Sequence, residues 1–495
     1  MASKPLVPLK YPPPLHAYLC TMLMVVYNIY LASFKSFFFM FVWLVLISMA
    51  NRASAIEHET RSFHVTPGTS YFVDRGGVPI LWLGDTWWFC PSMLCPMDGS
   101  SNPQIPSMFK ELVDLRAAQG FNVVQLAFLG ASAANGNSLL NLYKDDSMLA
   151  VRPAYWQNVR RYVRYANEQG LTVAVGVGFH RDLDKIELDQ LKALWQDLLL
   201  ELGQFNVVWF VAGEYNVFAD QARVDKVEAL IAFIRHHDKQ QRLITLHPAD
   251  WTRNALRISD KTHLDFTMVQ SGHGAEPPPV SIYSSSVKPG QAAAPVVEAE
   301  CRYEGIHGGT SADDIRACMV RAIMAGAAGF SYGAHGLWYP VQSESDQRFR
   351  EYGAAQPWWV ALRFPGAAAV GRVKQFFEGV QWWKMAASPG ALLAPEARGE
   401  RQQPYAIREE QSRALAWFPA ELPPGAPVLI QGLRTGGKYC MAWIQGRLLN
   451  APVPVIAPLV ADMRWTRLPD RPGLVDWLLM LRETSEDVCS HAAVN

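Results

Sequence analysis

Two glutamates stand directly after apolar runs of the chain. Glu214 follows VVWFVAG, and Glu300 follows PVVEA. A carboxylate in such a place is costly to bury unless it is paired or takes part in chemistry. Glycoside hydrolysis uses two such groups, because one acid protonates the leaving oxygen and one carboxylate acts on the anomeric carbon. We predict Glu214 and Glu300 as the catalytic pair. Glu298 is second choice, expected on the same strand face as Glu300 but one layer deeper, and unrelated surface ion pairs are the alternative.

The elements that would hold these glutamates are eight short apolar runs, rich in β-branched and aromatic residues, as in strands buried on both faces. They cover 78–85, 121–128, 171–179, 206–214, 242–247, 265–270, 295–300 and 329–335. Between them lie helical patterns at 104–120, 153–170, 188–203 and 312–329, each ending on or near a glycine. Eight such units in about 300 residues predict an α/β fold, a (β/α)8 TIM barrel. A doubly wound open sheet is the alternative, but no GxGxxG follows the first run.

Polar or aromatic residues stand at the end of every predicted strand, where barrel enzymes carry their chemistry. We expect them to bind substrate, although a strand end that meets solvent would also be polar. The candidates are Asp85, Trp87, Trp88, Gln125, His180, Tyr215, His247, Gln270, Tyr303, Glu304, His335 and Trp338. Adjacent strand residues point in opposite directions, so at least one of Trp87 and Trp88 is expected to line the site.

The composition fits a large globular core and a sugar ligand. Apolar residues make up 50% of the 495 residues and charged residues 18%, which excludes global disorder. The 45 basic residues balance the 45 acidic ones, so no excess positive charge favours nucleic acid. The 17 Trp residues suit the stacking of sugar rings, although most should lie in the core. We therefore predict an oligo- or polysaccharide partner and no nucleic acid.

The N-terminal segment has the features of a secretion signal. An uncharged run at 36–50 follows Lys35, and the small residues Ala53-Ser54-Ala55 come next. The run is short for a membrane span, so we predict a signal peptide cleaved after Ala55 and a secreted or periplasmic protein. The leader before Lys35 is long, and residues 17–34 are also largely apolar. An internal start or a retained membrane anchor is the alternative, and 1–55 is left out of the fold prediction.

The texture of the sequence changes after about Phe377. Short strands punctuated by Pro and Gly follow at 413–419, 426–433, 438–446 and 453–458. They predict a C-terminal antiparallel β-sandwich at 378–475, preceded by a barrel at 56–377 with a short N-terminal β segment. Residues 476–495 are expected to be a frayed tail, because SEDVCSHAAVN offers little to bury.

The cysteines show no metal-binding spacing. Cys90 and Cys95 are close enough in sequence for a disulfide in an exported chain, and two unlinked thiols are equally compatible. The remaining four beyond the leader are isolated, and no CxxC or HExxH occurs. We predict no structural zinc, no other metal and no cofactor.

Several motifs in order resemble the apiosidase-like glycoside hydrolases, a barrel family. FHVTPGTSYFVDRGGVPILWLGDTWW resembles the opening of that family, and LRAAQGFNVVQLAF, PVVEAECRYEGI and GAAGFSYGAHGLW resemble later barrel segments. FFEGVQWWKMAASPGAL is similar to the linker into its C-terminal β domain, which has been described as collagen-binding. The resemblance covers residues 61–450.

The resemblance implies a role for each glutamate. Glu300 matches the nucleophile position and Glu214 the acid/base position, where family members often have Asp. Two glutamates reach further than an Asp and a Glu, which favours a short gap and a retaining mechanism. No Asn precedes Glu214, unlike the best-known retaining barrel glycosidases.

The prediction is therefore an exported glycoside hydrolase that acts on side chains of plant or microbial polysaccharides. It would meet a membrane only through an uncleaved N-terminal segment. One alternative is a carbohydrate-binding protein on an inactive barrel. The other is a metal-dependent hydrolase that uses Asp85, His180, His247 and His273, although no His-x-His follows the first strand.

Overall fold

The computed structural model describes most of the chain beyond residue 61. The described residues are 62–89, 107–127, 152–249, 258, 263–274, 277, 279–285, 293–341, 343, 345, 350–388, 390–449 and 453–489. They all belong to one compact unit that begins at Thr60. The predicted signal segment and the Cys90 and Cys95 pair lie outside the described residues.

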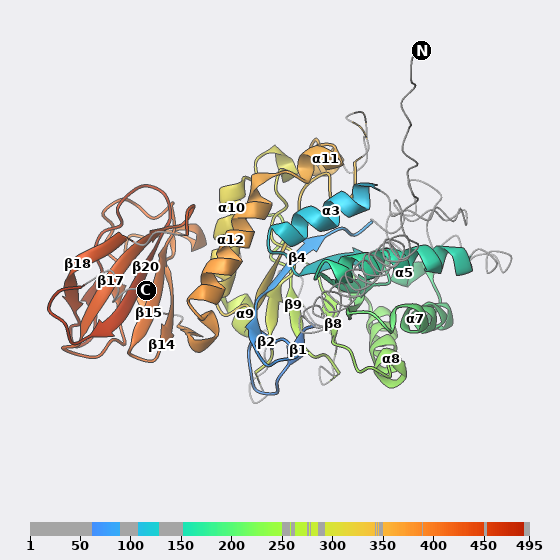
Figure 1. The fold of residues 1–495 in the computed structure, drawn as a ribbon, viewed down its shortest axis with the longest axis horizontal. Helices are drawn as coiled ribbons and strands as arrows, with labels where there is room; N and C mark the ends of the chain where they lie inside the picture. The colour runs from blue at the N-terminus through green and yellow to red at the C-terminus, as the bar shows by residue number, and fades with distance from the viewer. Residues whose placement is uncertain are drawn as a thin grey trace, which may run out of the picture. The chain divides into compact units, whose positions relative to one another are not determined.

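Eight parallel strands form one nearly closed sheet, so the predicted barrel is confirmed (Figure 1). The strands are β4 (Trp82–Thr86), β5 (Val123–Ala127), β6 (Thr172–Gly176), β7 (Val207–Gly213), β8 (Ile244–His247), β9 (Thr267–Val269), β10 (Val296–Glu298) and β11 (Gly329–Tyr332). Each lies within or against a predicted run, and the spatial order is β8-β7-β6-β5-β4-β11-β10-β9. The two end strands approach where the Asp265 N–H donates to the Ile244 carbonyl at 2.9 Å.

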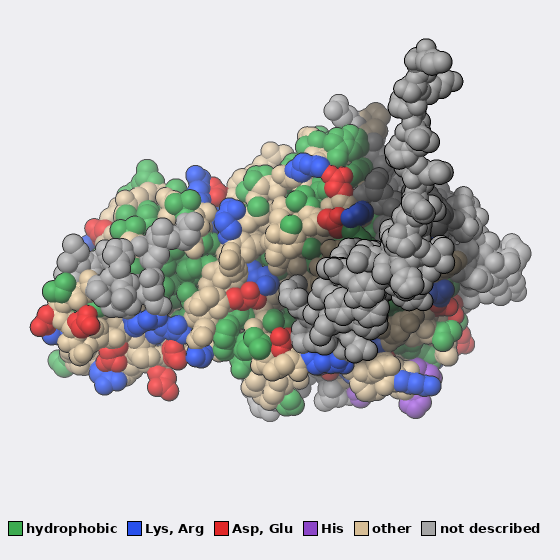
Figure 2. Space-filling view, in the orientation of Figure 1, with side chains coloured by type: hydrophobic (Ala, Val, Ile, Leu, Met, Phe, Trp, Pro, Cys, Tyr) green, Lys and Arg blue, Asp and Glu red, His purple; other side chains and the backbone are tan. Residues whose placement is uncertain are grey.

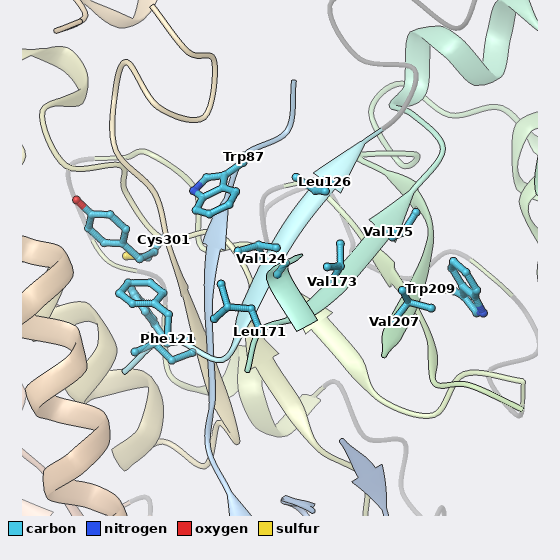
Figure 3. Close-up of a cluster of buried hydrophobic side chains, with 14 of the residues drawn as sticks. Trp87, Phe121, Val124, Leu126, Leu171, Val173, Val175, Val207, Trp209 and Cys301 are labelled. Atoms are coloured by element: carbon cyan, nitrogen blue, oxygen red, sulfur yellow. The ribbon is translucent and has the colours of Figure 1, made fainter. Parts of the chain in front are cut away.

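Side chains of the barrel strands alternate between two apolar layers. Residues such as Val123, Ala174 and Phe210 pack together inside the barrel. Their neighbours, including Val124 and Trp209, face outward and pack in the core between strands and helices (Figure 3). Because both faces are buried, the strands read as continuous apolar runs.

Helices surround the sheet, and the four predicted ones are present. They are α3 (Ser107–Ala118), α5 (Arg152–Glu168), α7 (Leu188–Leu202) and α10 (Ala312–Met324). The structure adds the long helices α8 (Gln221–His237) and α12 (Pro365–Gly379), and the short ones α6 (His180–Lys185), α9 (Ser281–Ser285) and α11 (Trp358–Ala361). Gly120 and Gly170 follow α3 and α5 with φ of 86° and 82°, the left-handed conformation that glycine favours at helix ends.

A small antiparallel sheet covers the amino-terminal end of the barrel strands. It consists of β1 (His64–Val65), β2 (Phe72–Val73) and β3 (Pro79–Ile80). The ring of Phe72 lies 5.9 Å from that of Trp82, at the start of β4, and 5.1 Å from that of Phe266. This packing fills one end of the barrel and leaves the carboxyl ends of the strands for chemistry.

Two antiparallel sheets make up the C-terminal region, as the fold prediction required. One has the order β12-β14-β15-β20-β17-β18 and the other β13-β16-β19. The first contains β12 (Ala386–Ala387), β14 (Tyr405–Glu409), β15 (Arg413–Phe418), β17 (Lys438–Gln445), β18 (Val453–Val460) and β20 (Trp477–Thr484). The second contains β13 (Leu392–Leu393), β16 (Leu429–Ile430) and β19 (Thr466–Arg467). Residues from both sheets, including Phe418 and Ile430, share one apolar core.

The prediction of a frayed tail from residue 476 is wrong. Strand β20 pairs with both β15 and β17 and buries Leu479 and Leu481 in the core. Cys489, beyond the strand, forms a disulfide with Cys440 of β17. Asp476 accepts a hydrogen bond from Arg316 of α10, which ties the β region to the barrel. The apolar WLLML of the strand outweighs the polar residues that follow it.

Charges of both signs are mixed on the face of the molecule that Figure 2 shows. In the face shown in Figure 2, acidic and basic side chains are interspersed over the described residues. This distribution agrees with the equal numbers of acidic and basic residues in the sequence. Within the described part of the chain, no helix combines the length and apolar character needed to cross a bilayer.

Candidate active site

The structure brings Glu214 and Glu300 to the same end of the barrel. Glu214 directly follows β7, and Glu300 lies two residues beyond β10. Nε2 of Gln270 donates to Oε1 of Glu214 at 3.2 Å, and Nε2 of His273 lies 3.0 Å from Oε1 of Glu300. One segment of four residues after β9, Gln270–His273, thus contacts both carboxylates.

His247, the last residue of β8, provides a second link between the two glutamates. Its carbonyl accepts the N–H of Glu214 at 2.6 Å, and its Nε2 lies 3.6 Å from Oε2 of Glu300. Burial lowers the pKa of His247, and the charge of Glu300 opposes this only in part.

Glu214 leaves its strand in an unusual backbone conformation. Its φ is 47°, in the left-handed region that a non-glycine residue occupies at a cost of about 1 kcal/mol or more. A Cβ on the preceding Gly213 would lie 2.7 Å from the Phe179 ring, so glycine is required there. The Glu214 side chain is 30% exposed, and Nδ1 of His180, the first residue of α6, lies 3.9 Å from its Oε2. Such strain is typical of functional sites.

Glu300 is a buried carboxylate whose surroundings favour the ionised form. Its side chain is only 7% exposed, and this burial raises its pKa. The hydrogen bond and charge of His273, the charge of His247 and the hydrogen bond with Tyr303 act in the opposite direction. The net effect holds the pKa of Glu300 below its ordinary value, so the group is an anion at neutral pH.

Aromatic side chains surround Glu300. The Tyr303 hydroxyl accepts a hydrogen bond from Nε1 of Trp88 at 2.8 Å, and the Trp88 ring stands edge-on to that of His247 at 4.9 Å. Trp338 lies 6.0 Å from Tyr303 between ring centroids. These residues form an apolar wall with hydrogen-bonding edges beside the carboxylate, which suits a sugar.

Trp87 lies on the other side of the strand. It is fully buried among outward-facing residues, with its ring 6.2 Å from that of Phe109 in α3 (Figure 3). Of the two adjacent tryptophans, Trp88 is thus the one near Glu300, as the alternation of a strand requires.

The prediction that Asp85 binds substrate is contradicted by its position. Nε of Arg116 in α3 lies 2.6 Å from its Oδ2, and both side chains are fully buried. Asp85 faces outward like Trp87, toward the helix layer, so this ion pair is structural. The metal site that combined Asp85 with three histidines is therefore not assembled. Among the described residues, no group of three or more His, Cys, Asp and Glu could hold a metal ion.

Tyr215 and Gln125 also lie away from the two carboxylates. Tyr215 is fully buried in the core between strands and helices, because it faces away from Glu214. Gln125 lies at the middle of β5, where its side chain accepts a hydrogen bond from Ser331 of β11. It points into the barrel but supports the packing of the interior.

Glu304 caps a helix. Its carboxylate accepts the N–H of Gly366 at the start of α12 at 2.9 Å and the hydroxyl of Tyr332 at 2.7 Å. The predicted substrate role for Glu304 is thus replaced by a structural one. Nε2 of His335 lies 3.1 Å from the carbonyl oxygen of Gly353, and Nδ1 of His335 accepts a hydrogen bond from Nε1 of Trp338 at 3.2 Å. His335 therefore orients Trp338.

Glu298 does not share the face of Glu300. Its carboxylate points into the outer layer and accepts the hydroxyl of Tyr283 in α9 at 2.8 Å. Ala299 packs inside the barrel, so strict alternation would keep Glu300 on the outer face with Glu298. The strand ends at Glu298, however, and Glu300 contacts His247 and His273 instead. Glu298 is therefore not in the position of a nucleophile.

Sequence reasoning missed two residues of the site. The sequence suggests His273 only as a metal ligand, yet its Nε2 lies 3.0 Å from Oε1 of Glu300. Tyr352 lies in a 3-10 turn at Arg350–Tyr352, with its ring 6.1 Å from Trp338. Its ring also lies 6.5 Å from that of His273, which contacts Glu300. Burial, and then the charges of Glu214, Glu351 and Glu300, raise the pKa of Tyr352. It follows the eighth strand, in a stretch without a strand or helix pattern.

A parallel barrel that carries two glutamates at its strand ends, one of them buried and ionised, is organised as a barrel glycoside hydrolase. The family model for the apiosidase-like catalytic domain matches residues 66–384. The chain belongs to this apiosidase-like family, and its enzyme class is glycoside hydrolase. The resemblance noted in the sequence is thereby confirmed.

Solved structures agree on the fold. A structure described as a glycoside hydrolase is 20% identical with a TM-score of 0.65, and the alignment covers 86% of this chain and 98% of that one. A glycoside hydrolase family 5 protein from Bacteroides vulgatus is 20% identical with a TM-score of 0.67, covering 87% and 95%. At this identity the similarity concerns the fold alone. No curated protein matches the chain significantly.

Proposed function

We propose that this enzyme hydrolyses glycosidic bonds in two steps with retention of anomeric configuration. In the first step a carboxylate oxygen of Glu300 bonds to the anomeric carbon, the bond to the leaving oxygen breaks, and Glu214 gives that oxygen its proton. In the second step Glu214 takes a proton from water, the water oxygen bonds to the anomeric carbon, and Glu300 is released as a carboxylate.

The contacts of the Gln270–His273 segment carry this proposal. His273 binds the buried Glu300, whose lowered pKa suits a nucleophile. Gln270 binds Glu214, whose greater exposure suits a group that must reach the leaving oxygen and then water. Two carboxylates in unlike surroundings at one end of a barrel match the division of roles in this reaction.

The proposed substrates are oligosaccharides or side chains of plant or microbial polysaccharides. Membership of the apiosidase-like family supports this class. Trp88, Tyr303 and Trp338 pack beside Glu300, are 3%, 3% and 8% exposed, and would form the apolar side of a sugar site. His180 and Gln270 would supply hydrogen-bonding groups near Glu214.

We also propose that the protein is exported, with cleavage after Ala55 or with the N-terminal segment kept as an anchor. Two disulfides, Cys301–Cys318 and Cys440–Cys489, support this proposal because disulfides persist in oxidising compartments. N-terminal sequencing of protein from fractionated cells distinguishes the two forms. Intact full-length protein in the cytosol would contradict export.

The test of the proposed function is hydrolysis by the chain 56–495 on a panel of 4-nitrophenyl glycosides and pectic oligosaccharides. At least one member should be cleaved, and Glu300→Gln or Glu214→Gln should lower kcat by orders of magnitude. Glu304→Gln is the matched control, since the helix cap should affect stability and leave kcat unchanged. Sugar binding without hydrolysis, or full activity of Glu300→Gln, would contradict the proposal.

A further inference from the structure

Glu298 is a fully buried carboxylate that binds two backbone amides of the active-site loops. Its Oε1 accepts the N–H of Ser271 at 3.1 Å and the N–H of Glu300 at 3.2 Å. Its Oε2 accepts the hydroxyl of Tyr283 at 2.8 Å. The side chain has no exposed surface. One carboxylate thus joins the ends of β9 and β10 to helix α9.

These bonds stand where the sheet stops supplying partners. The last paired residues of β9 and β10 are Val269 and Glu298, and Ala299 still donates to the Val269 carbonyl at 2.8 Å. Beyond this point the N–H groups of Ser271 and Glu300 donate to Oε1 of Glu298 in place of a strand carbonyl. A buried N–H without an acceptor costs about 1–3 kcal/mol. Oε1 of Glu298 avoids this cost by replacing the backbone acceptors that a continued strand would provide.

The two amides belong to the segments that hold both catalytic candidates. Ser271 lies between Gln270, which contacts Glu214, and His273, which contacts Glu300. The adjoining N–H of Gly272 donates to the Glu300 carbonyl at 3.1 Å. Displacement of the Ser271 amide would move the partners of both carboxylates together. A shift of about 1 Å in such a site can reduce turnover by two orders of magnitude.

We infer that Glu298 is a positioning residue, whose Oε1 fixes Glu300 and the Gln270–His273 segment in the geometry that catalysis needs. The inference rests on the proposed roles of Glu214 and Glu300. It assigns Glu298 an acceptor function only, with no proton transfer to substrate. Burial raises the pKa of Glu298 to about 7. The protonated side chain can still accept hydrogen bonds from both amides if Oε1 is the carbonyl oxygen.

Two substitutions separate this role from a charge-based one. Glu298→Gln removes the charge but keeps an acceptor oxygen at the same reach, and its amide N–H can donate to the Tyr283 oxygen. Glu298→Asp keeps the charge but withdraws the carboxylate by about 1.5 Å, one carbon–carbon bond. Positioning predicts that kcat of the Gln variant stays within threefold of wild type, while that of the Asp variant falls at least tenfold with little change in KM.

The first readout is kcat and KM on the best 4-nitrophenyl glycoside of the panel. The second is hydrogen exchange of peptides that contain Ser271 and Glu300, which needs no activity. Exchange should rise in Glu298→Asp and stay at the wild-type rate in Glu298→Gln. Asp238→Asn is the matched control. Asp238 is also a buried carboxylate that accepts two backbone amides, those of Gln240 and Arg242, and its loss should lower the melting temperature without changing kcat.

The outcomes distinguish this inference from the proposed function. If Glu300→Gln is inactive but Glu298→Asp is as active as Glu298→Gln, with equal exchange, Glu298 has no positioning role. An inactive Glu298→Gln with unchanged exchange would also overturn the inference, because charge would then be required. If Glu300→Gln keeps full activity, the proposed nucleophile fails, and the exchange rates alone decide whether Glu298 orders these loops.

Discussion

Replacing His273 with phenylalanine should move the acid limb of activity to higher pH. Nε2 of His273 lies 3.0 Å from Oε1 of Glu300, whose side chain is 7% exposed. Phenylalanine keeps a ring beside Tyr303, which lies 4.7 Å from the His273 ring between centroids, but it removes the hydrogen-bonding nitrogen. Burial then raises the pKa of Glu300 against weaker opposition, because the bond and charge of His273 contribute most to lowering it.

The expected size follows from the energy of such a bond. A hydrogen bond to a charged group contributes about 1.5–3 kcal/mol, so the pKa of Glu300 should rise by about 1 to 2 units. In the proposed mechanism Glu300 must be ionised to attack, so kcat/KM should fall as the pH drops through its pKa. The wild-type enzyme should stay active below pH 4.5, the ordinary pKa of a glutamate. The acid limb of His273→Phe should lie about 1 to 2 pH units above that of the wild type.

The assay is kcat/KM as a function of pH on one 4-nitrophenyl glycoside, between about pH 3 and pH 8. His237→Phe is the control, since His237 stacks on Phe233 in α8 and should leave the profile unchanged. An acid limb at the wild-type position in His273→Phe, with normal folding, would refute the assignment of that limb to a Glu300 carboxylate held by His273.

Three further changes separate catalytic from structural roles. Trp88→Phe should lower kcat/KM about tenfold, because Tyr303 loses its indole donor, while Trp87→Phe should lower only the melting temperature. Replacing Cys301 and Cys318, 17 residues apart, with serine should reduce the free energy of unfolding by about 3 kcal/mol in urea titrations. It should also reduce kcat, because this disulfide adjoins Glu300. Replacing Cys440 and Cys489 with serine should leave kcat unaltered. Burial raises the pKa of Glu298 to about 7, so protonated Glu298 stabilises the fold below pH 4.5 and this contribution is lost as the pH rises to 7. Across that interval the wild type should lose about 3 kcal/mol of stability relative to Glu298→Gln.

The barrel could be predicted because its strands are buried on both faces. Continuous apolar runs of strand length, separated by helical patterns, leave few other folds, and all eight strands lie in or beside the expected positions. The same runs placed Glu214 and Glu300 at strand ends. The position of a glutamate after an apolar run is a local signal, so its place at a strand end can be predicted without knowledge of distant residues.

The partners of the site residues could not be predicted, because they are distant in sequence or lie beyond regular structure. Asp85 was expected at the substrate, but Arg116 of the following helix neutralises it. Strand alternation also ceases at the last residue of a strand, so Glu298 and Glu300 diverge although they are two positions apart. Tyr352 lies in a short turn with no periodic pattern.

The C-terminal region illustrates how composition near a chain end can mislead. Residues that follow β20 are polar, and they suggested a tail that includes the strand. The strand itself, WLLMLRET at Trp477–Thr484, pairs on both edges at the centre of the sheet. Cys489 is held by a cysteine 49 positions earlier, a link that spacing alone does not reveal.

The most direct test of the two-glutamate mechanism is peptide mass mapping of Glu214→Ala after reaction with a 2,4-dinitrophenyl glycoside. This leaving group needs no protonation, so Glu300 should still attack, while the loss of Glu214 should slow hydrolysis of the intermediate. We expect one glycosyl group covalently bound to the peptide that contains Glu300, and none when Glu300 is also replaced by Gln. A glycosyl group on another residue, or no covalent intermediate together with an inverted product, would contradict the two-glutamate mechanism.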